Sequence, residues 1–388
     1  MPVLLLECAV QNYPWGSTES IPRLLQRPNP NNKPWAELWM GAHPRAPSTL
    51  ASGQSLADYI AEDSPARLGH QVAGATLPFL FKILAAQSPL SIQCHPTRQQ
   101  AEAGFDAEER AGIPIDARQR NYRDRNHKTE LIVALEEFWA LKGFRAPEEI
   151  VDLFRRAQVL SLQAALGELE AGGELATFYQ GLLAMPESDK QQALTELAQG
   201  AGQLPEAVAY WTGEFMRLYP GDIGACSALL LRLVQLAPGQ ALYVDAGELH
   251  AYLRGTGLEI MANSDNVLRG GLTRKHVDLA ELMRVLRFEY PELDIVEPQV
   301  HGALSSYNTP SSEFALSCLG LGGVPTHSLS VSSASIILSL GGSAQLGWKG
   351  GSLSLGCGQV GFCSADTQEL EIAGDAQLWI ATIPGSAV

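Results

Sequence analysis

A helical block interrupts a chain that otherwise has the pattern of β-strands. Residues 147–219 carry apolar side chains at a 3.6-residue period, and glycine or proline breaks this pattern at several points. Pro147 suits the first turn of a helix, and Glu148 and Glu149 suit its positive end. We therefore expect four or five short helices inserted into a mainly β chain.

Short apolar runs separated by turn residues mark the chain on both sides of this block. Residues 77–84 and 131–135 read as buried strands before it, and residues 229–236 read as a strand after it. Beyond about residue 300 the chain is rich in serine and glycine, with short alternating runs at regular spacing. Such spacing is typical of a sandwich or barrel.

Composition narrows the classes of partner. The chain has 388 residues, enough for two or three domains, and its net charge of −15 disfavours binding to nucleic acid or anionic lipid. Its six cysteines form no CxxC pair, which fits a reducing compartment. No leader and no apolar run near the ~18 residues of a membrane helix is evident. We expect a cytoplasmic protein that binds neither nucleic acid nor membrane.

The segment LSIQCHPT, residues 90–97, places polar groups on one face of a strand. Because side chains alternate along a strand, Ser91, Gln93 and His95 share one side, and Cys94 takes the other. An amide oxygen and an imidazole then lie side by side. Taken alone, this pattern also fits a polar strand face next to a loop.

The segment NYRDRNHKTELI, residues 121–132, leads basic side chains into an apolar strand. Extended geometry puts Lys128 and Glu130 on one face, with His127 and Thr129 opposite. The alternative is a solvated, charged loop that enters a core strand.

A third segment supplies another imidazole from a short turn. Asp245-x-Gly247-x-x-His250 is similar to the second metal motif of cupins, PxGxxH, with Asp245 in place of proline. A single histidine in a β protein can also be a hydrogen-bonded structural residue. Four side chains could nevertheless close around one Zn²⁺ and leave a position open for water or substrate: Gln93, His95, Glu130 and His250.

These segments and several others resemble the type I phosphomannose isomerase family. The resemblance runs from about residue 11 to residue 290 in the segments YPWGS, AELWMGAHPRAPS, QCHP, NHKTE, YPGDIG, LHAYL and EIMANSDNVLRGGLT. It implies a zinc enzyme, with one Zn²⁺ per chain, that interconverts mannose 6-phosphate and fructose 6-phosphate through an enediol. It also implies a mainly β fold of cupin-like jelly-roll domains with an inserted all-α domain.

We divide the chain accordingly. Residues 1–145 and 223–300 are expected to form the catalytic jelly roll, and residues 146–222 the helical insertion. Residues 301–388 are expected to form a second jelly-roll-like domain without metal, because they hold only His301 and His327 and no paired ligands.

The resemblance also implies roles for individual residues. The family's metal ligands fall on Gln93, His95, Glu130 and His250, and its essential arginine falls on Arg269. Positions for proton handling and ring opening fall on Lys128, His127 and Asp265, and other pocket positions on Trp15, Lys82, Ser91, Glu259 and Lys275. Cys94, Thr129 and Arg274 depart from the family's motifs, and the last two replace prolines that would stiffen their loops.

The chemistry required by an aldose–ketose isomerisation fits these positions. Lys128 is expected to relay the proton between the two carbons, His127 and Asp265 to assist ring opening, and Ser91 and Lys275 to bind the phosphate. The only partner expected is this small sugar phosphate, and the protein is expected to be a monomer. The alternatives are another cupin metalloenzyme, such as a dioxygenase or a different sugar isomerase, and a non-catalytic sugar-phosphate-binding regulator.

Overall fold

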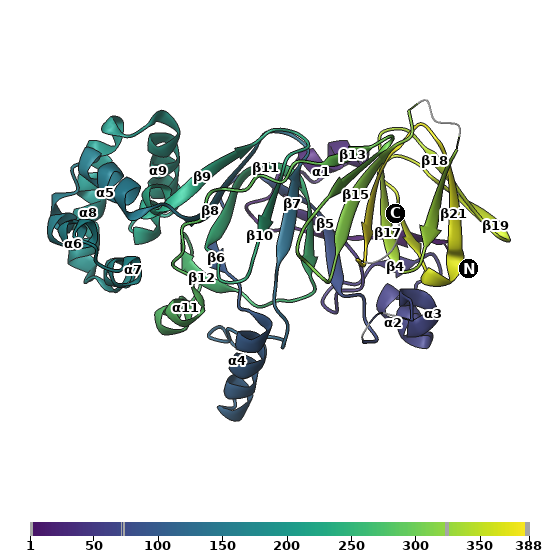
Figure 1. Cartoon of the computed structure of the whole chain (residues 1–388), viewed down its shortest axis with the longest axis horizontal. Helices are drawn as coiled ribbons and strands as arrows, with labels where there is room; N and C mark the ends of the chain where they lie inside the picture. Colours follow the sequence, from purple (N-terminus) through teal and green to yellow (C-terminus); the bar gives the residue numbers. More distant parts are fainter. Residues whose placement is uncertain (1–2, 71, 73, 323–325, 385–388) are drawn as a thin grey trace.

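The computed structural model describes residues 3–70, 72, 74–322 and 326–384. The molecule is elongated, with the helical block at one end and the C-terminal strands at the other (Figure 1). The mainly β fold with a helical insertion is confirmed. Its N-terminal helices are α1 (Ser20–Leu24), α2 (Leu56–Glu62) and α3 (Ser64–Leu68).

A ten-stranded antiparallel sheet occupies the middle of the molecule. Its longest strand is β11, which pairs with β6 and β8 near its beginning and with β5 and β7 further along. β11 therefore connects the half of the sheet that contains β6 and β8 with the half that contains β5 and β7. The strands are β2 (Ala9–Gln11), β3 (Glu37–Met40), β5 (Phe79–Ala86), β6 (Ile92–Cys94), β7 (Glu130–Ala134), β8 (Phe138–Phe144), β9 (Leu231–Leu236), β10 (Ala241–Val244), β11 (His250–Ala262) and β12 (Leu268–Gly271).

The helical insertion follows β8 and ends before β9 (Figure 1). Its first helix begins at Pro147 with Glu148 and Glu149 in the first turn, as predicted. Its helices are α5 (Pro147–Arg156), α6 (Gln163–Glu170), α7 (Leu175–Ala184), α8 (Glu187–Gly200) and α9 (Glu206–Leu218). The strand expected over residues 229–236 is wrong at its start, because α10 (Ser227–Leu230) precedes β9; a continuous apolar run has no period that separates helix from strand.

Two further helices flank the central sheet. The helix α4 (Arg98–Arg110) projects from the molecule, and Thr97 closes a capping box with Gln100 at its N-terminus. The second is α11 (Leu279–Val285), which contacts β12 and α7.

The C-terminal stretch forms an eight-stranded and a four-stranded sheet. The larger sheet also takes in β1 (Val3–Glu7) and β4 (Thr49–Leu50), so the two ends of the chain share a sheet. The remaining strands are β13 (Gln299–His301), β14 (Leu304–Tyr307), β15 (Ala315–Gly320), β16 (His327–Val331), β17 (Ser335–Leu340), β18 (Ala344–Trp348), β19 (Gly351–Leu355), β20 (Val360–Cys363), β21 (Gln368–Gly374) and β22 (Gln377–Thr382). The domain boundaries at residues 145, 222 and 300 stay a prediction.

Two hydrophobic clusters cross these sequence stretches. One joins the insertion to the central sheet, for example Phe154 and Trp211 with Ile92 and Leu268. Another joins the central sheet to the C-terminal strands, for example Phe81 with Trp379. Within the described residues, no helix has the length and apolar character needed to cross a membrane.

Candidate active site

Three buried side chains meet where β6 ends and where β7 and β11 begin. Ligand atoms of His95, Glu130 and His250 all lie within 4.8 Å of one another. The Nε2 atom of His95 lies 3.5 Å from Oε2 of Glu130, and the Nε2 atom of His250 lies 3.0 Å from Oε1. The turn residue Gly247 ties two of these segments together, because its N–H donates to the carbonyl of His95 at 2.8 Å.

The outer ring nitrogens orient both imidazoles for metal binding. Nδ1 of His95 lies 2.8 Å from the carbonyl of Asn266, and Nδ1 of His250 lies 3.1 Å from the carbonyl of Glu248. A proton held on Nδ1 by such a contact leaves the Nε2 lone pair free for a cation. Burial and the nearby Lys128 ammonium lower the pKa of His95 to about 3, so its ring is neutral at pH 7. This donor set fits Zn²⁺.

Gln93 and Arg269 lie beside this cluster on neighbouring strands. Gln93 of β6 is the direct cross-strand partner of His250 in β11 and of Arg269 in β12. Directly opposed side chains of an antiparallel pair lie on the same face. The structure therefore places Gln93 next to the His–Glu–His group, on the face predicted for it, while Cys94 is buried in the core.

Lys128 and Tyr252 both contact Glu130. The Nζ atom of Lys128 lies 2.7 Å from Oε2 of Glu130 and 3.2 Å from Nε2 of His95, so the centre already accommodates a positive charge. The Tyr252 hydroxyl donates to Oε1 at 3.1 Å. Burial alone would raise the pKa of Glu130, but Lys128 and His250 hold it well below its ordinary value. Sequence reasoning missed Tyr252, although it lies two residues after His250 on the same strand face.

A cavity of about 650 Å³ opens beside the cluster. It is lined by six of the predicted residues, namely Trp15, Ser91, Gln93, Asp265, Arg269 and Lys275. Arg45, Arg118 and Arg123 also line it, so its wall is basic in an acidic protein. Burial and the nearby Arg269, Arg123 and Arg45 lower the pKa of Lys275. A dianionic group would relieve this repulsion.

Arg269 keeps part of its guanidinium free to bind a ligand. Its buried Nε has no hydrogen-bond partner among the described residues, and the side chain lines the cavity. Burial and Arg123 lower the pKa of Arg269, but a guanidinium stays charged at any working pH. Its planar fork can therefore bind adjacent oxygens of a substrate.

A buried ion-pair network continues the site along β3, β5 and β11. The Nζ atom of Lys82 lies 2.5 Å from Oε2 of Glu259 and 3.5 Å from Oε1 of Glu37. Glu37 also accepts a hydrogen bond from the indole of Trp39 at 2.8 Å, and both residues line the cavity. Sequence reasoning missed Glu37 and Trp39. Their spacing of two residues in a short strand was the available signal, because it puts both on one face.

His127 points away from Lys128, as strand alternation predicts. Its Nε2 lies 2.9 Å from Oε1 of Glu313, which belongs to the C-terminal stretch. Asp265 lines the cavity and pairs with Arg45 at 3.1 Å, and His43 lies 3.7 Å away. The structure therefore brings Asp265 to the cavity, whereas His127 faces a neighbouring part of the fold.

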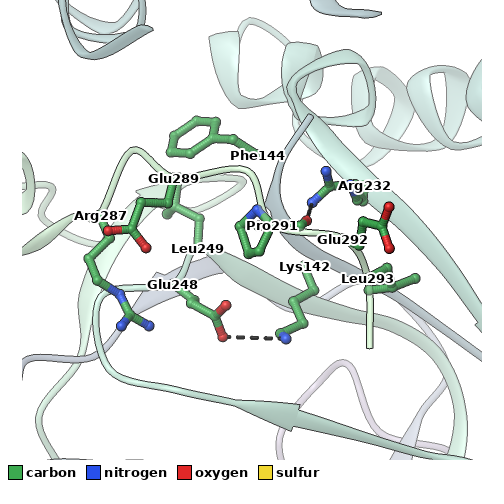
Figure 2. A pocket seen from close by; sticks show the side chains of 11 residues that line it. Lys142, Phe144, Arg232, Glu248, Leu249, Arg287, Glu289, Pro291, Glu292 and Leu293 are labelled. Atoms are coloured by element: carbon green, nitrogen blue, oxygen red, sulfur yellow. Dashed lines mark hydrogen bonds and ion pairs between the residues drawn. The ribbon is translucent and has the colours of Figure 1, made fainter. Parts of the chain in front are cut away.

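Ion pairs brace the turn that carries His250 from its outer side. Arg287 donates to Asp245 at 3.0 Å, and Nζ of Lys142 lies 3.5 Å from Glu248. Figure 2 shows Lys142 and Glu248 joined by this ion pair, and both residues line a cavity of about 170 Å³. Asp245 stands where the cupin motif has proline, and Arg287 pairs with it at the surface of this turn.

Comparison with known proteins identifies the family. The model of the phosphomannose isomerase type I catalytic domain matches residues 3–147. The mannose-6-phosphate isomerase of Escherichia coli is 40% identical over 382 residues, 95% of this chain and 97% of that protein. The human mannose-6-phosphate isomerase is 34% identical over 388 residues, 88% of each chain.

Two solved structures of mannose 6-phosphate isomerase support the same family. Zinc-bound mannose 6-phosphate isomerase superposes with a TM-score of 0.92 at 38% identity, covering 99% of this chain and 100% of that chain. The apo form from Salmonella typhimurium gives the same TM-score and identity and covers 99% of both chains. Fold and site define a β-rich protein with a buried His–Glu–His metal centre. The chain belongs to the type I phosphomannose isomerase family.

Proposed function

We propose that this chain interconverts mannose 6-phosphate and fructose 6-phosphate at the His95–Glu130–His250 centre. As a family member it is a zinc-dependent mannose-6-phosphate isomerase. The observation that carries the proposal is the position of this buried metal-binding group beside a basic cavity in an otherwise acidic protein. That combination suits a small, anionic substrate.

Four residues are proposed to hold Zn²⁺: Gln93, His95, Glu130 and His250. When bound, the ion supplies a Lewis acid that stabilises negative charge on the substrate oxygens. Arg269 shares this task because it presents a permanent cation to the cavity. Lys128 relays the proton between the two carbons, a role supported by its contacts with Glu130 and His95.

Other residues are proposed to bind and open the sugar. Asp265 assists ring opening from the cavity wall, and His127 supports it from the far side of its strand. Ser91 and Lys275 bind the phosphate, because both line the cavity where its wall is basic. Trp15 contacts the sugar, while Lys82 and Glu259 hold the adjoining wall through their buried ion pair.

The protein is proposed to act as a cytoplasmic monomer on this small molecule, without nucleic-acid or membrane partners. The net charge of −15 and six free cysteines support this view.

Metal analysis and a turnover assay on one preparation test the proposal. We expect one zinc per chain by mass spectrometry and fructose 6-phosphate to mannose 6-phosphate turnover that stops on chelation and returns with zinc. Bound zinc without turnover would favour another cupin chemistry or a binding protein. Protein that binds no zinc would contradict the ligand set.

A further inference from the structure

One buried carboxylate of the C-terminal stretch contacts the two segments that adjoin the metal centre. Glu313 precedes β15 and is 8% exposed, yet it does not line the 650 Å³ cavity and is not one of the residues proposed for catalysis. Two serine hydroxyls of its own loop donate to it, Ser311 at 3.2 Å and Ser312 at 3.0 Å. The loop that carries Glu313 therefore holds its carboxylate in place through its own hydrogen bonds.

Glu313 lies in contact with two segments that carry metal ligands. Arg98 donates to its Oε1 at 3.0 Å, and Nε2 of His127 lies 2.9 Å from the same atom. Arg98 begins α4 three residues after His95, while His127 lies three residues before Glu130. Burial alone would raise the pKa of Glu313, but His127 and the two serines hold it at about 2, so the carboxylate is charged at pH 7.

We propose that Glu313 is a positioning residue for the metal centre, and that this is how the C-terminal stretch contributes to the reaction. By holding Arg98 and His127 at one point, it fixes the spacing between the segment that carries His95 and the segment that carries Lys128 and Glu130. Groups that orient metal ligands commonly change affinity or activity by about 10–100-fold. The activity part of this inference rests on the proposed function, whereas the zinc part does not.

The test compares Glu313→Ala with Glu313→Gln. Zinc affinity of the chelated protein is measured by competition with a chromophoric chelator, and kcat and KM for mannose 6-phosphate are measured on the zinc-loaded protein. We expect Glu313→Ala to weaken zinc binding and lower kcat by about tenfold each, with a smaller change in KM because the cavity wall is untouched. Glu313→Gln keeps an acceptor oxygen and should recover part of the zinc affinity and part of kcat.

A matched control removes another ion pair between the same two parts of the fold. Asp366, in the turn Ala365–Thr367, pairs with Arg67 of α3 at 3.3 Å, away from any segment with a metal ligand. Asp366→Ala should leave zinc affinity and kcat near wild type, even if it lowers stability.

Equal behaviour of Glu313→Ala and Asp366→Ala would overturn the inference. If Glu313→Ala does not fold, Arg98→Met tests the same ion pair by removing its other member. This variant should fold, because the Arg98 side chain is half exposed. It should weaken zinc binding by a few-fold, and unchanged affinity would count against the inference. A wild-type protein that binds zinc without turnover would contradict the proposed function and leave the zinc comparison valid.

Discussion

Lys128 contacts two members of the metal-binding group, Glu130 and His95, and is the residue proposed to relay the proton. We expect Lys128→Ala to lower kcat by about 10²-fold or more, because a positioned acid–base group contributes about 10²–10⁴-fold. Zinc content should stay near wild type, since the proposed ligands remain. Lys190→Ala is the control, because that lysine pairs with Glu187 on a helix of the insertion. Near-normal turnover of zinc-loaded Lys128→Ala would rule out the assignment.

His95 predicts how stability depends on pH in the chelated protein. Its pKa is about 3 in the fold and about 6.5 in an unfolded chain, owing first to burial and then to Lys128. Between about pH 3 and about pH 6.5 the unfolded state therefore binds one more proton than the folded state. Stability is therefore complete above about pH 6.5 and falls by roughly 1.4 kcal/mol per pH unit below it.

Urea unfolding of the chelated protein between pH 7.5 and 5 measures this slope. We expect His95→Asn to flatten it and His301→Asn, which replaces an exposed histidine, to leave it unchanged. Equal slopes for all three proteins would show that His95 is not held neutral by the fold.

At the scale of elements, a buried cross-strand ion pair lies between β5 and β11. Lys82 and Glu259 face each other in register and are both buried. Burial alone would lower the pKa of Lys82, but Glu259 and Glu37 raise it above its ordinary value. Glu259→Leu leaves the buried Lys82 cation with one ion-pair partner, Glu37 at 3.5 Å, so we expect a loss of about 3 kcal/mol in unfolding free energy, the low end of the cost of breaking a buried pair.

The double variant Lys82→Met/Glu259→Leu is the informative comparison. A buried pair replaced by apolar side chains of similar size is often neutral or stabilising, but the double variant also takes the cation away from Glu37 and leaves it with the Trp39 indole, so we expect only part of the lost stability to return. Chemical denaturation gives both values. A double variant as unstable as Glu259→Leu would show that the ion pair itself stabilises the sheet. Activity should stay low in both variants, because each disturbs the wall near the cavity.

Strand alternation explains why part of the site could be predicted from sequence. It separates Gln93 and His95 from Cys94, and Lys128 from His127, without knowledge of the fold. It cannot say which strands become neighbours. Tyr252 against Glu130 and Glu313 against His127 depend on pairings between distant segments. The pairing of β1 with β20 could not be predicted for the same reason, because strands that are far apart in the sequence leave no local signal of their pairing.

At the scale of the whole molecule, the hydrophobic clusters do not follow the predicted domain boundaries. The insertion shares a core with β6 and β12, which carry Gln93 and Arg269. The C-terminal strands share another with β3, β5 and β7. Removing either part would therefore expose apolar surface of the sheet that bears the site, so neither part is expected to be dispensable.

Because the parts of the molecule share hydrophobic cores, we expect one cooperative unfolding transition. Trp211 lies in the insertion and Trp379 lies in the C-terminal sheet, so the two side chains belong to different shared cores. The chain has seven tryptophans, so the contribution of each reporter is the difference in fluorescence between wild type and Trp211→Phe or Trp379→Phe. These two difference signals and circular dichroism should give coincident denaturant midpoints, because parts that share a core lose their packing together. Zinc should raise all midpoints together, since it binds only the folded state. Separated midpoints, or a zinc shift seen by one probe alone, would show that the parts unfold independently despite the shared cores.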